Sequence, residues 1–266
     1  MSKQIIILAG GKGSRMGSPI PKVLIPLSGK PIIKHLLTTV EKIKQYTAPV
    51  VVVGFKSELV VEELGPKYIY AFQAEQNGTA HAVLTAKPYI TAENVVVLCG
   101  DMPFLSRKSL QKLTEMHEVN GSTISMFTGF VPSFNGIYEH FQSFGRIIRN
   151  EDGEVVQIRE FTDASDSEKE IREVNPGMYI FKTAWLWKHM EEIGKANSQG
   201  EFYLTDIIEV AIKDGKHISS FAILPEEMIG INTPDQLSYA HTLLKPTGIS
   251  ARTANLLKRD KHVYVK

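Results

Sequence analysis

Short β-branched apolar runs alternate with stretches of helical periodicity through the first half of the chain. The three continuous runs are Ile5–Leu8, Val50–Val53 and Val95–Leu98. Unbroken apolar runs of this length are typical of strands covered on both faces. Apolar residues recur at helical spacing over Pro31–Gln45, and shorter helices are expected after Ser57 and after Ser106. The alternation predicts βαβ units and therefore an α/β fold, a Rossmann-like, mostly parallel sheet flanked by helices.

The second half has a different pattern. Residues 146–149 and 155–158 flank a turn sequence, Glu151-Asp152-Gly153-Glu154, which predicts a hairpin. A further strand is expected at Met178–Phe181 and an amphipathic helix over Leu204–Ile212, whereas Phe130–Phe144 has no clear period and is predicted to be a loop or insertion. We therefore expect a small β-rich part beside the main sheet.

Length and charge argue against several classes of protein. The 266 residues suffice for one large domain, which we place at residues 1–245, followed by a tail at 246–266. A net charge of +1 argues against a nucleic-acid-binding or membrane-surface protein. Cys99 is the single cysteine, and no apolar stretch is long enough for a signal peptide or a membrane span. A cytoplasmic location is therefore expected.

A glycine-rich loop directly after the first strand carries the strongest local signal. It reads Leu8-Ala9-Gly10-Gly11-Lys12-Gly13-Ser14-Arg15-Met16, and Pro21-Lys22-Val23-Leu24 follows. Glycines here let backbone N–H groups approach a ligand, and Arg15 and Lys22 add the positive charge that a triphosphate requires. A plain glycine turn with two surface bases is the alternative. A Walker A loop is excluded because Gly13 follows Lys12, and a dinucleotide fingerprint is excluded because Met16 stands where its third glycine belongs.

These two segments resemble the sugar-nucleotide pyrophosphorylases, and most closely the N-terminal uridyltransferase domain of the bifunctional N-acetylglucosamine-1-phosphate uridyltransferases. The shared pattern is Leu-x-Gly-Gly-x-Gly-x-Arg-Met followed by Pro-Lys-x-Leu. The resemblance implies the nucleotidyltransferase fold and catalytic roles for Arg15 and Lys22, which neutralise the reacting phosphates in that family. It also implies a set of nucleotide-binding residues: Leu8, Ala9, Gly10, Gly11, Gly13 and Gly100.

The segment Gln73–Val83 is similar to the family's base-recognition segment. A glutamine side chain offers both a donor and an acceptor and can read a pyrimidine edge. Gly78 permits close backbone approach, and Thr79 can cap the next helix. The resemblance implies that Gln73, Gly78 and Thr79 hold uracil. His81 is expected to be a packing residue, and we assign it no catalytic role.

Two later residues are expected to bind magnesium. Asp101 follows the third apolar run, where α/β sheets bind ligands, and Mg²⁺ takes carboxylate oxygens together with substrate phosphates. Asn232 lies in Gly230-Ile231-Asn232, which resembles the family's Gly-Val-Asn segment, and the resemblance makes it the second protein ligand. For either residue, a role as a helix cap or turn residue is the alternative.

The resemblance also implies a set of sugar-binding residues: Gly145, Glu160, Asn175 and Tyr203. Phe144–Ile148 is similar to the family's Tyr-Gly-Arg-Ile segment, and Glu201–Asp206 to its Glu-Tyr-Tyr-Leu-Thr-Asp segment. Pro176 replaces the threonine expected after Asn175, which leaves the identity of the sugar open. Cys99 stands where a relative carries tyrosine, and we assign it no role.

Together these residues predict a magnesium-dependent enzyme that transfers a nucleotidyl group, uridylyl in the first place, from an NTP such as UTP to a sugar 1-phosphate. N-acetylglucosamine 1-phosphate is the expected acceptor, and UDP-sugar and pyrophosphate are the products. Hexose-1-phosphate uridylyl- or thymidylyltransferases, molybdopterin guanylyl- or cytidylyltransferases and a non-catalytic nucleotide-binding module are the alternatives. No nucleic-acid or membrane partner is expected, the oligomeric state is open, and because no hexapeptide repeat is present we expect no acetyltransferase activity.

Overall fold

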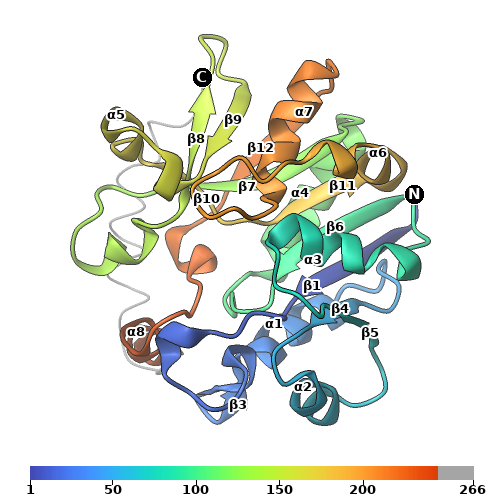
Figure 1. Ribbon diagram of the computed structural model, residues 1–266, viewed down its shortest axis with the longest axis vertical. Coiled ribbons are helices and arrows are strands. Elements are labelled where there is room, and N and C mark those ends of the chain that lie inside the picture. The colour runs from blue at the N-terminus through green and yellow to red at the C-terminus, as the bar shows by residue number, and fades with distance from the viewer. Residues whose placement is uncertain (245–266) are drawn as a thin grey trace.

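The apolar strands of the N-terminal half form the parallel side of one large sheet. In the computed structural model, which describes residues 1–244, the strand order on this side is β5-β4-β1-β6 (Figure 1). The strands are β1 (Lys3–Leu8), β4 (Val50–Val53), β5 (Ile69–Phe72) and β6 (Asn94–Cys99), and they pair with one another in parallel. The three predicted strands are thus confirmed. The sequence analysis did not predict β5, a short edge strand that is only partly buried.

The second half extends the same sheet with antiparallel strands. Strand β11 (Tyr179–Lys182) lies between β6 and β7 (Ile124–Phe130) and is antiparallel to both. The order then continues through β10 (Glu173–Asn175), β8 (Gly145–Arg149) and β9 (Val155–Arg159), with β12 (Ile218–Ala222) paired in parallel to β7. The predicted hairpin is confirmed as β8–β9. A separate two-stranded ribbon joins β2 (Pro26–Leu27) to β3 (Lys30–Pro31).

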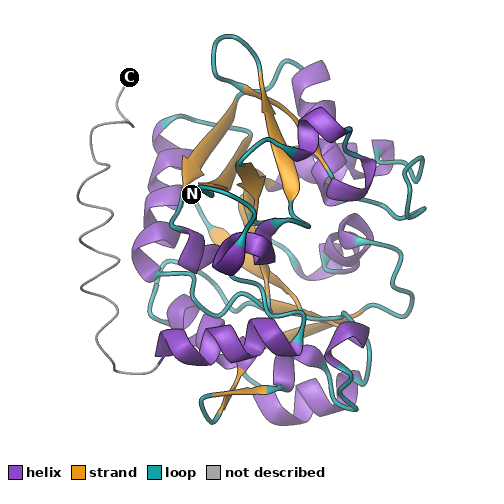
Figure 2. Ribbon diagram, turned by 90° about the vertical axis from the view of Figure 1, so that its left-hand side faces the viewer, coloured by secondary structure: helices purple, strands orange, loops and turns teal. Residues whose placement is uncertain are grey.

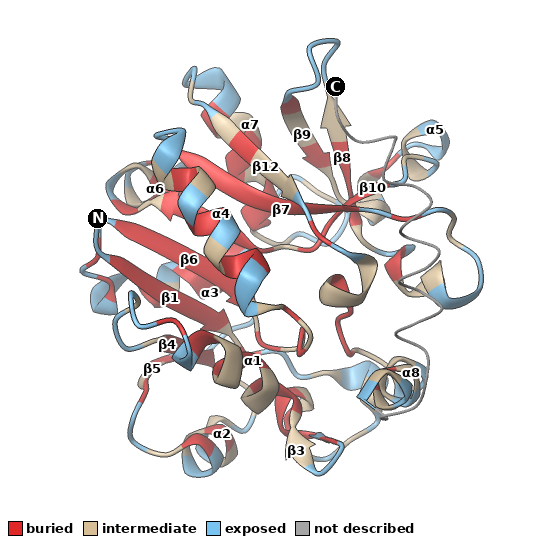
Figure 3. Cartoon of the chain, turned by 180° about the vertical axis from the view of Figure 1, so that it is seen from behind, coloured by how far each residue is buried: buried red, intermediate tan, exposed pale blue. Residues whose placement is uncertain are grey.

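Helices cover both faces of the sheet, as the continuous apolar strands require (Figure 2). They are α1 (Ile32–Glu41), α2 (Ser57–Leu64), α3 (Thr79–Thr85), α4 (Arg107–Val119), α5 (Asp166–Lys169), α6 (Thr183–His189), α7 (Ile207–Lys213) and α8 (Pro234–Leu244). Figure 3 shows the strands buried between these layers, and the Val50–Val53 side chains have no exposed surface. The α/β fold with a mostly parallel N-terminal sheet and flanking helices is therefore confirmed.

Some predicted boundaries shift because of contacts that lie far away in the sequence. The helix expected over Pro31–Gln45 ends at Glu41, since the chain turns so that the Thr47 backbone N–H can donate to the Lys3 carbonyl at 3.0 Å. The helix expected over Leu204–Ile212 is α7, preceded by a 3₁₀ turn at Leu204–Asp206. No helix of the described part of the chain is long and apolar enough to cross a membrane. The tail expected at 246–266 lies outside the described residues.

Candidate active site

The phosphate loop follows β1 and is tied to the neighbouring strands. The Ala9 N–H donates to the Val52 carbonyl at 2.8 Å, and the Gly10 carbonyl accepts from the Phe55 N–H at 3.2 Å and from Gln76 Nε2 at 2.6 Å. Arg15 lies in an exposed 3₁₀ turn, Ser14–Met16, and no described residue pairs with its guanidinium. The loop therefore lies at the carboxyl end of a parallel strand and carries a cation that is available to an anionic ligand.

Lys22, Asp101 and Asn232 meet although they are distant in sequence. Lys22 Nζ lies 2.5 Å from Asp101 Oδ2 and 2.5 Å from Asn232 Oδ1. The backbone brings the segments together, because the Ile231 N–H donates to the Asp101 carbonyl at 3.0 Å. Packing does the same, since a small core joins Ile231 and Ala240 of the C-terminal segment to the apolar residues that follow Lys22: Ile25, Leu27 and Ile32.

Neither Asp101 nor Asn232 acts as a helix cap. The cap of α4 is Ser106, whose hydroxyl accepts from the Ser109 N–H, and at the start of α8 the Thr233 hydroxyl accepts from the Gln236 N–H. Neither side chain is therefore needed at a helix end, and the Lys22 ammonium shows that a cation fits between their oxygens. Mg²⁺ suits such a set, because it takes oxygen ligands and completes its shell with water and substrate phosphates. No group of three or more His, Cys, Asp or Glu side chains forms a closed metal site in residues 1–244.

The predicted base-recognition segment lies beside the loop. Gln73 is 93% buried, and its Nε2 lies 3.1 Å from His81 Nδ1, so a residue that we expected only to pack instead orients this carboxamide. A Cβ at Gly78 would come within 2.5 Å of the Phe202 carbonyl oxygen, so the close approach permitted there is to protein backbone.

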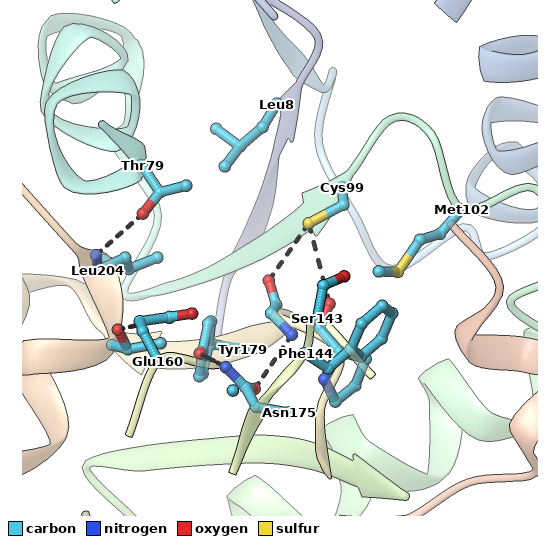
Figure 4. A pocket seen from close by; sticks show the side chains of 14 residues that line it. Leu8, Thr79, Cys99, Met102, Ser143, Phe144, Glu160, Asn175, Tyr179 and Leu204 are labelled. Carbon is cyan, nitrogen blue, oxygen red and sulfur yellow. Dashed lines mark hydrogen bonds between the residues drawn. The ribbon is translucent and has the colours of Figure 1, made fainter. Parts of the chain in front are cut away.

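The prediction that Thr79 caps a helix is wrong. The cap position of α3 is Gly78, and Thr79 is the first helical residue. Its hydroxyl instead accepts from the Leu204 N–H at 3.0 Å (Figure 4). This partner comes from a 3₁₀ turn 125 residues further along the chain, so no local pattern could have indicated it. The contact joins the nucleotide segment to the segment 203–206.

A cavity of about 210 Å³ lies between the loop and the β-rich part. Its wall joins predicted nucleotide-binding residues, Leu8 and Thr79, to three predicted sugar-binding residues, Gly145, Glu160 and Asn175 (Figure 4). The other lining residues are Cys99, Met102, Ser143, Phe144, Pro176, Gly177, Tyr179, Leu204 and Thr205. Tyr203, the fourth predicted sugar-binding residue, does not line it, although its neighbours Leu204 and Thr205 do.

Hydrogen bonds fix the polar groups of this cavity. Glu160 Oε1 accepts from the Thr205 hydroxyl at 2.9 Å. Asn175 Nδ2 donates to the Tyr179 hydroxyl at 2.7 Å, and its Oδ1 accepts from the Gly177 N–H at 3.0 Å. The Cys99 thiol, to which we assigned no role, lies 3.5 Å from the Gly177 carbonyl oxygen and forms part of the wall.

Burial sets the charge of these groups. It raises the pKa of the Glu160 carboxyl above its ordinary value, and the carboxylates of Asp206 and Asp163 raise it further, against the Thr205 hydroxyl. Burial also raises the pKa of the Cys99 thiol to about 12 and holds the pKa of Tyr179 well above its usual range. Near neutral pH the thiol and the phenol are therefore uncharged, and these two groups can act on a ligand only through hydrogen bonding and shape.

Arg146 holds the backbone that leads into the cavity wall, a role that the sequence did not reveal. Its fully buried guanidinium donates to the carbonyls of Gln142, Phe144 and Lys169 and lies 4.3 Å from the centre of the Phe134 ring. These bonds hold the backbone that leads into Gly145 at the cavity wall.

Comparisons with known proteins identify the family of this chain. Residues 5–148, more than half of the chain, match the model of the MobA-like NTP transferase domain. The Bifunctional protein GlmU of Brevibacillus brevis is 40% identical over 249 residues, which cover 92% of this chain and 52% of that protein. The protein of the same name from Exiguobacterium sibiricum is 39% identical over 251 residues, which cover 92% of this chain and 54% of that protein. The chain spans about half the length of these curated relatives.

Solved structures share the fold at low sequence identity. A UDP-glucose pyrophosphorylase complexed with UDP-glucose superposes with a TM-score of 0.72 and 18% identity, covering 91% of this chain and 98% of that one. A CMP:2-keto-3-deoxy-manno-octonic acid synthetase complexed with CTP gives a TM-score of 0.67 and 18% identity, covering 92% and 98%. With more than half of its length matched by the family model, the chain belongs to the MobA-like NTP transferase family and is a nucleotidyltransferase.

Proposed function

We propose that this protein transfers the uridylyl group of UTP to a sugar 1-phosphate, N-acetylglucosamine 1-phosphate in the first place, and releases pyrophosphate. The observation that carries the proposal is a cavity whose wall joins Leu8 and Thr79 of the nucleotide segments to Gly145, Glu160 and Asn175 of the β-rich part. A cavity shared in this way favours an enzyme that holds two substrates against each other over one that binds a nucleotide alone. Magnesium dependence and a cytoplasmic location are parts of the proposal.

The proposed binding of UTP rests on the phosphate loop and on the base-recognition segment. Arg15 and Lys22 supply positive charge beside the glycine loop, which suits a triphosphate. A carboxamide such as that of Gln73, oriented by His81, has the donor and acceptor needed for a pyrimidine edge. Solved structures of the same fold hold UDP-glucose in one protein and CTP in another, and both support a pyrimidine base.

The chemistry needs positioning more than proton transfer. The attacking sugar phosphate is already ionised near neutral pH, so the enzyme has to align its oxygen with the α-phosphorus and offset the repulsion between two anions. Arg15 and Lys22 bind and stabilise the leaving pyrophosphate in this proposal, while Asn175 and Glu160 orient the sugar. Asp101 and Asn232 would hold Mg²⁺, which when bound neutralises phosphate charge.

Pyrophosphate release measured over a grid of substrates tests the proposal. UTP, dTTP, CTP and GTP are each combined with the 1-phosphates of glucose, N-acetylglucosamine, galactose and mannose, with Mg²⁺ and with EDTA. The expected result is release confined to UTP with one amino-sugar phosphate and lost in EDTA. Release only with hexose phosphates would redirect the proposal to hexose-1-phosphate uridylyl or thymidylyl transfer. Silence over the whole grid refutes it and favours the molybdopterin-type acceptor or a non-catalytic nucleotide-binding module.

A further inference from the structure

We propose that the Lys22 ammonium occupies the cation position between Asp101 and Asn232 in the free protein, and that a divalent cation enters only as Lys22 turns to the phosphates of the nucleotide. The inference rests on the proposed function, from which it takes the metal site and the nucleotide. It adds a mechanism by which the metal and the nucleotide promote each other's binding through one side chain.

Lys22 does not point toward a free phosphate site in this structure. Two of its three N–H donors are directed at Asp101 Oδ2 and Asn232 Oδ1, each 2.5 Å from Nζ. The Lys22 and Asp101 side chains keep only 12% and 16% of their surface exposed, so the contact differs from a loose surface ion pair. An ammonium held in this way has to leave these oxygens before it can contact a triphosphate.

A divalent cation cannot share these oxygens with the ammonium. Mg²⁺ binds its oxygen ligands at about 2.0–2.1 Å, so an ion held by both side chains lies close to the place that Nζ now takes. The lone pairs that face Nζ are the ones the metal needs, and two positive charges this close repel strongly in a partly buried site. Metal binding and the present position of Lys22 therefore exclude each other.

The surroundings of Lys22 give the displaced ammonium a destination. The side chain leaves the backbone at the start of a 3₁₀ turn, Lys22–Leu24, and its stem passes directly beside Gly13 of the phosphate loop. Lysine carries its charge on a flexible four-carbon stem, so rotation moves the ammonium without moving the backbone. When the Lys22 stem rotates away from Asp101 and Asn232, the ammonium therefore lies next to the loop that the triphosphate is proposed to contact.

Charge balance makes the exchange depend on the nucleotide. In the free protein the Asp101 carboxylate and the Lys22 ammonium neutralise each other. Entry of a divalent cation alone leaves that cation and a displaced ammonium against a single carboxylate, whereas a triphosphate supplies negative charge to both. Nucleotide therefore raises the affinity for metal and metal raises the affinity for nucleotide, since such coupling is reciprocal.

Mn²⁺ binding, followed by electron paramagnetic resonance of the free ion, tests the exchange without turnover because no sugar phosphate is added. We expect Lys22→Met, which keeps the stem and removes the charge, to bind Mn²⁺ on the order of tenfold or more tightly than the wild type in the absence of UTP. Addition of UTP, corrected for Mn²⁺–UTP formed in solution, should improve Mn²⁺ binding in the wild type and much less in the variant.

Two variants serve as matched controls. Arg15→Met removes a cation of the same loop, but the Arg15 guanidinium contacts neither Asp101 Oδ2 nor Asn232 Oδ1. The Mn²⁺ affinity of this variant without UTP should therefore equal that of the wild type. Asp101→Asn should abolish tight binding in the wild type and in Lys22→Met alike. Lys22→Gln is the second variant if thermal melting shows that Lys22→Met does not fold.

Equal Mn²⁺ affinity in the wild type and the Lys22 variants overturns the exchange. A gain of Mn²⁺ affinity in Arg15→Met as large as the gain in Lys22→Met overturns it as well. Failure of the proposed function is distinguishable, because it appears as silence in the pyrophosphate grid, which the Mn²⁺ titration does not use.

Discussion

Gly13→Ala tests whether the phosphate loop and Lys22 form one packed unit. Gly13 has φ +61°, in the left-handed region, and a Cβ there would lie 2.6 Å from Lys22 Cβ, inside van der Waals contact. The substitution therefore adds two penalties, a backbone conformation that L-residues disfavour and a clash with a part of the Lys22 side chain that cannot swing away.

The neighbouring glycines separate these penalties. Gly17 has the same φ of +61° but no heavy atom within 4 Å of its added Cβ, and Gly11 has neither a positive φ nor a neighbour within 4 Å. Left-handed backbone costs an L-residue about 1–2 kcal/mol, partly offset by the lower entropy of the unfolded chain, so Gly17→Ala should lose about 1 kcal/mol. The clash adds roughly 1–3 kcal/mol, so Gly13→Ala should lose about 3 kcal/mol, whereas Gly11→Ala should change stability by less than about 0.5 kcal/mol.

Thermal melting and steady-state kinetics together measure the effect. In a chain of this size about 1 kcal/mol corresponds to roughly 2–4 °C, so we expect Tm to fall by roughly 6–12 °C in Gly13→Ala and by roughly 2–4 °C in Gly17→Ala. Because the clash moves Lys22, kcat for pyrophosphate release in Gly13→Ala should fall at least about tenfold at a temperature where the variant is folded. The reasoning is refuted if Gly13→Ala has the same Tm as Gly17→Ala and keeps the wild-type kcat.

Three further changes test other parts of the molecule. Glu160→Gln should raise KM for the sugar phosphate about tenfold, because a charge-assisted hydrogen bond is replaced by a weaker neutral one, while KM for UTP stays constant; an equal rise in both would contradict a role on the sugar side. Arg146→Met should lower the free energy of unfolding by about 3–5 kcal/mol, since three hydrogen bonds from a buried guanidinium to backbone carbonyls are lost, and a Tm within about 2 °C of the wild type would contradict this. Burial and the nearby carboxylates of Glu209 and Asp163 raise the pKa of Asp206 to about 6. Between about pH 4 and pH 6 the folded protein therefore keeps a proton on Asp206 that the unfolded chain has already released, and the protein loses stability as the pH rises through this range. Asp206→Asn should therefore stabilise the protein by about 1–2 kcal/mol at pH 8, allowing for the partial exposure of this side chain, with the gain vanishing at pH 4 in urea unfolding; a gain that persists at pH 4 would exclude the charge as its cause.

Local patterns alone determined the parallel half of the sheet and the loop that follows its first strand. The runs at Ile5–Leu8, Val50–Val53 and Val95–Leu98 are continuous because helices cover both faces, and a glycine loop after such a strand has to lie at the carboxyl edge. The turn at 151–154 likewise fixes its hairpin locally. Periodicity and turn chemistry suffice here because the residues that decide each element lie within a few positions of one another.

Contacts between distant segments decided the rest, and only the tertiary structure shows them. Strand β11 lies antiparallel between β6 and β7, which no periodicity of its own sequence requires. The Thr79 hydroxyl accepts from the Leu204 N–H instead of capping its helix, and Lys22 meets Asn232 across 210 positions because the segment that leads into α8 packs against the segment after Lys22. A side chain chooses its partner by the free energy of the whole packed arrangement, so residue type and spacing nominated the site residues while the fold determined which atoms meet.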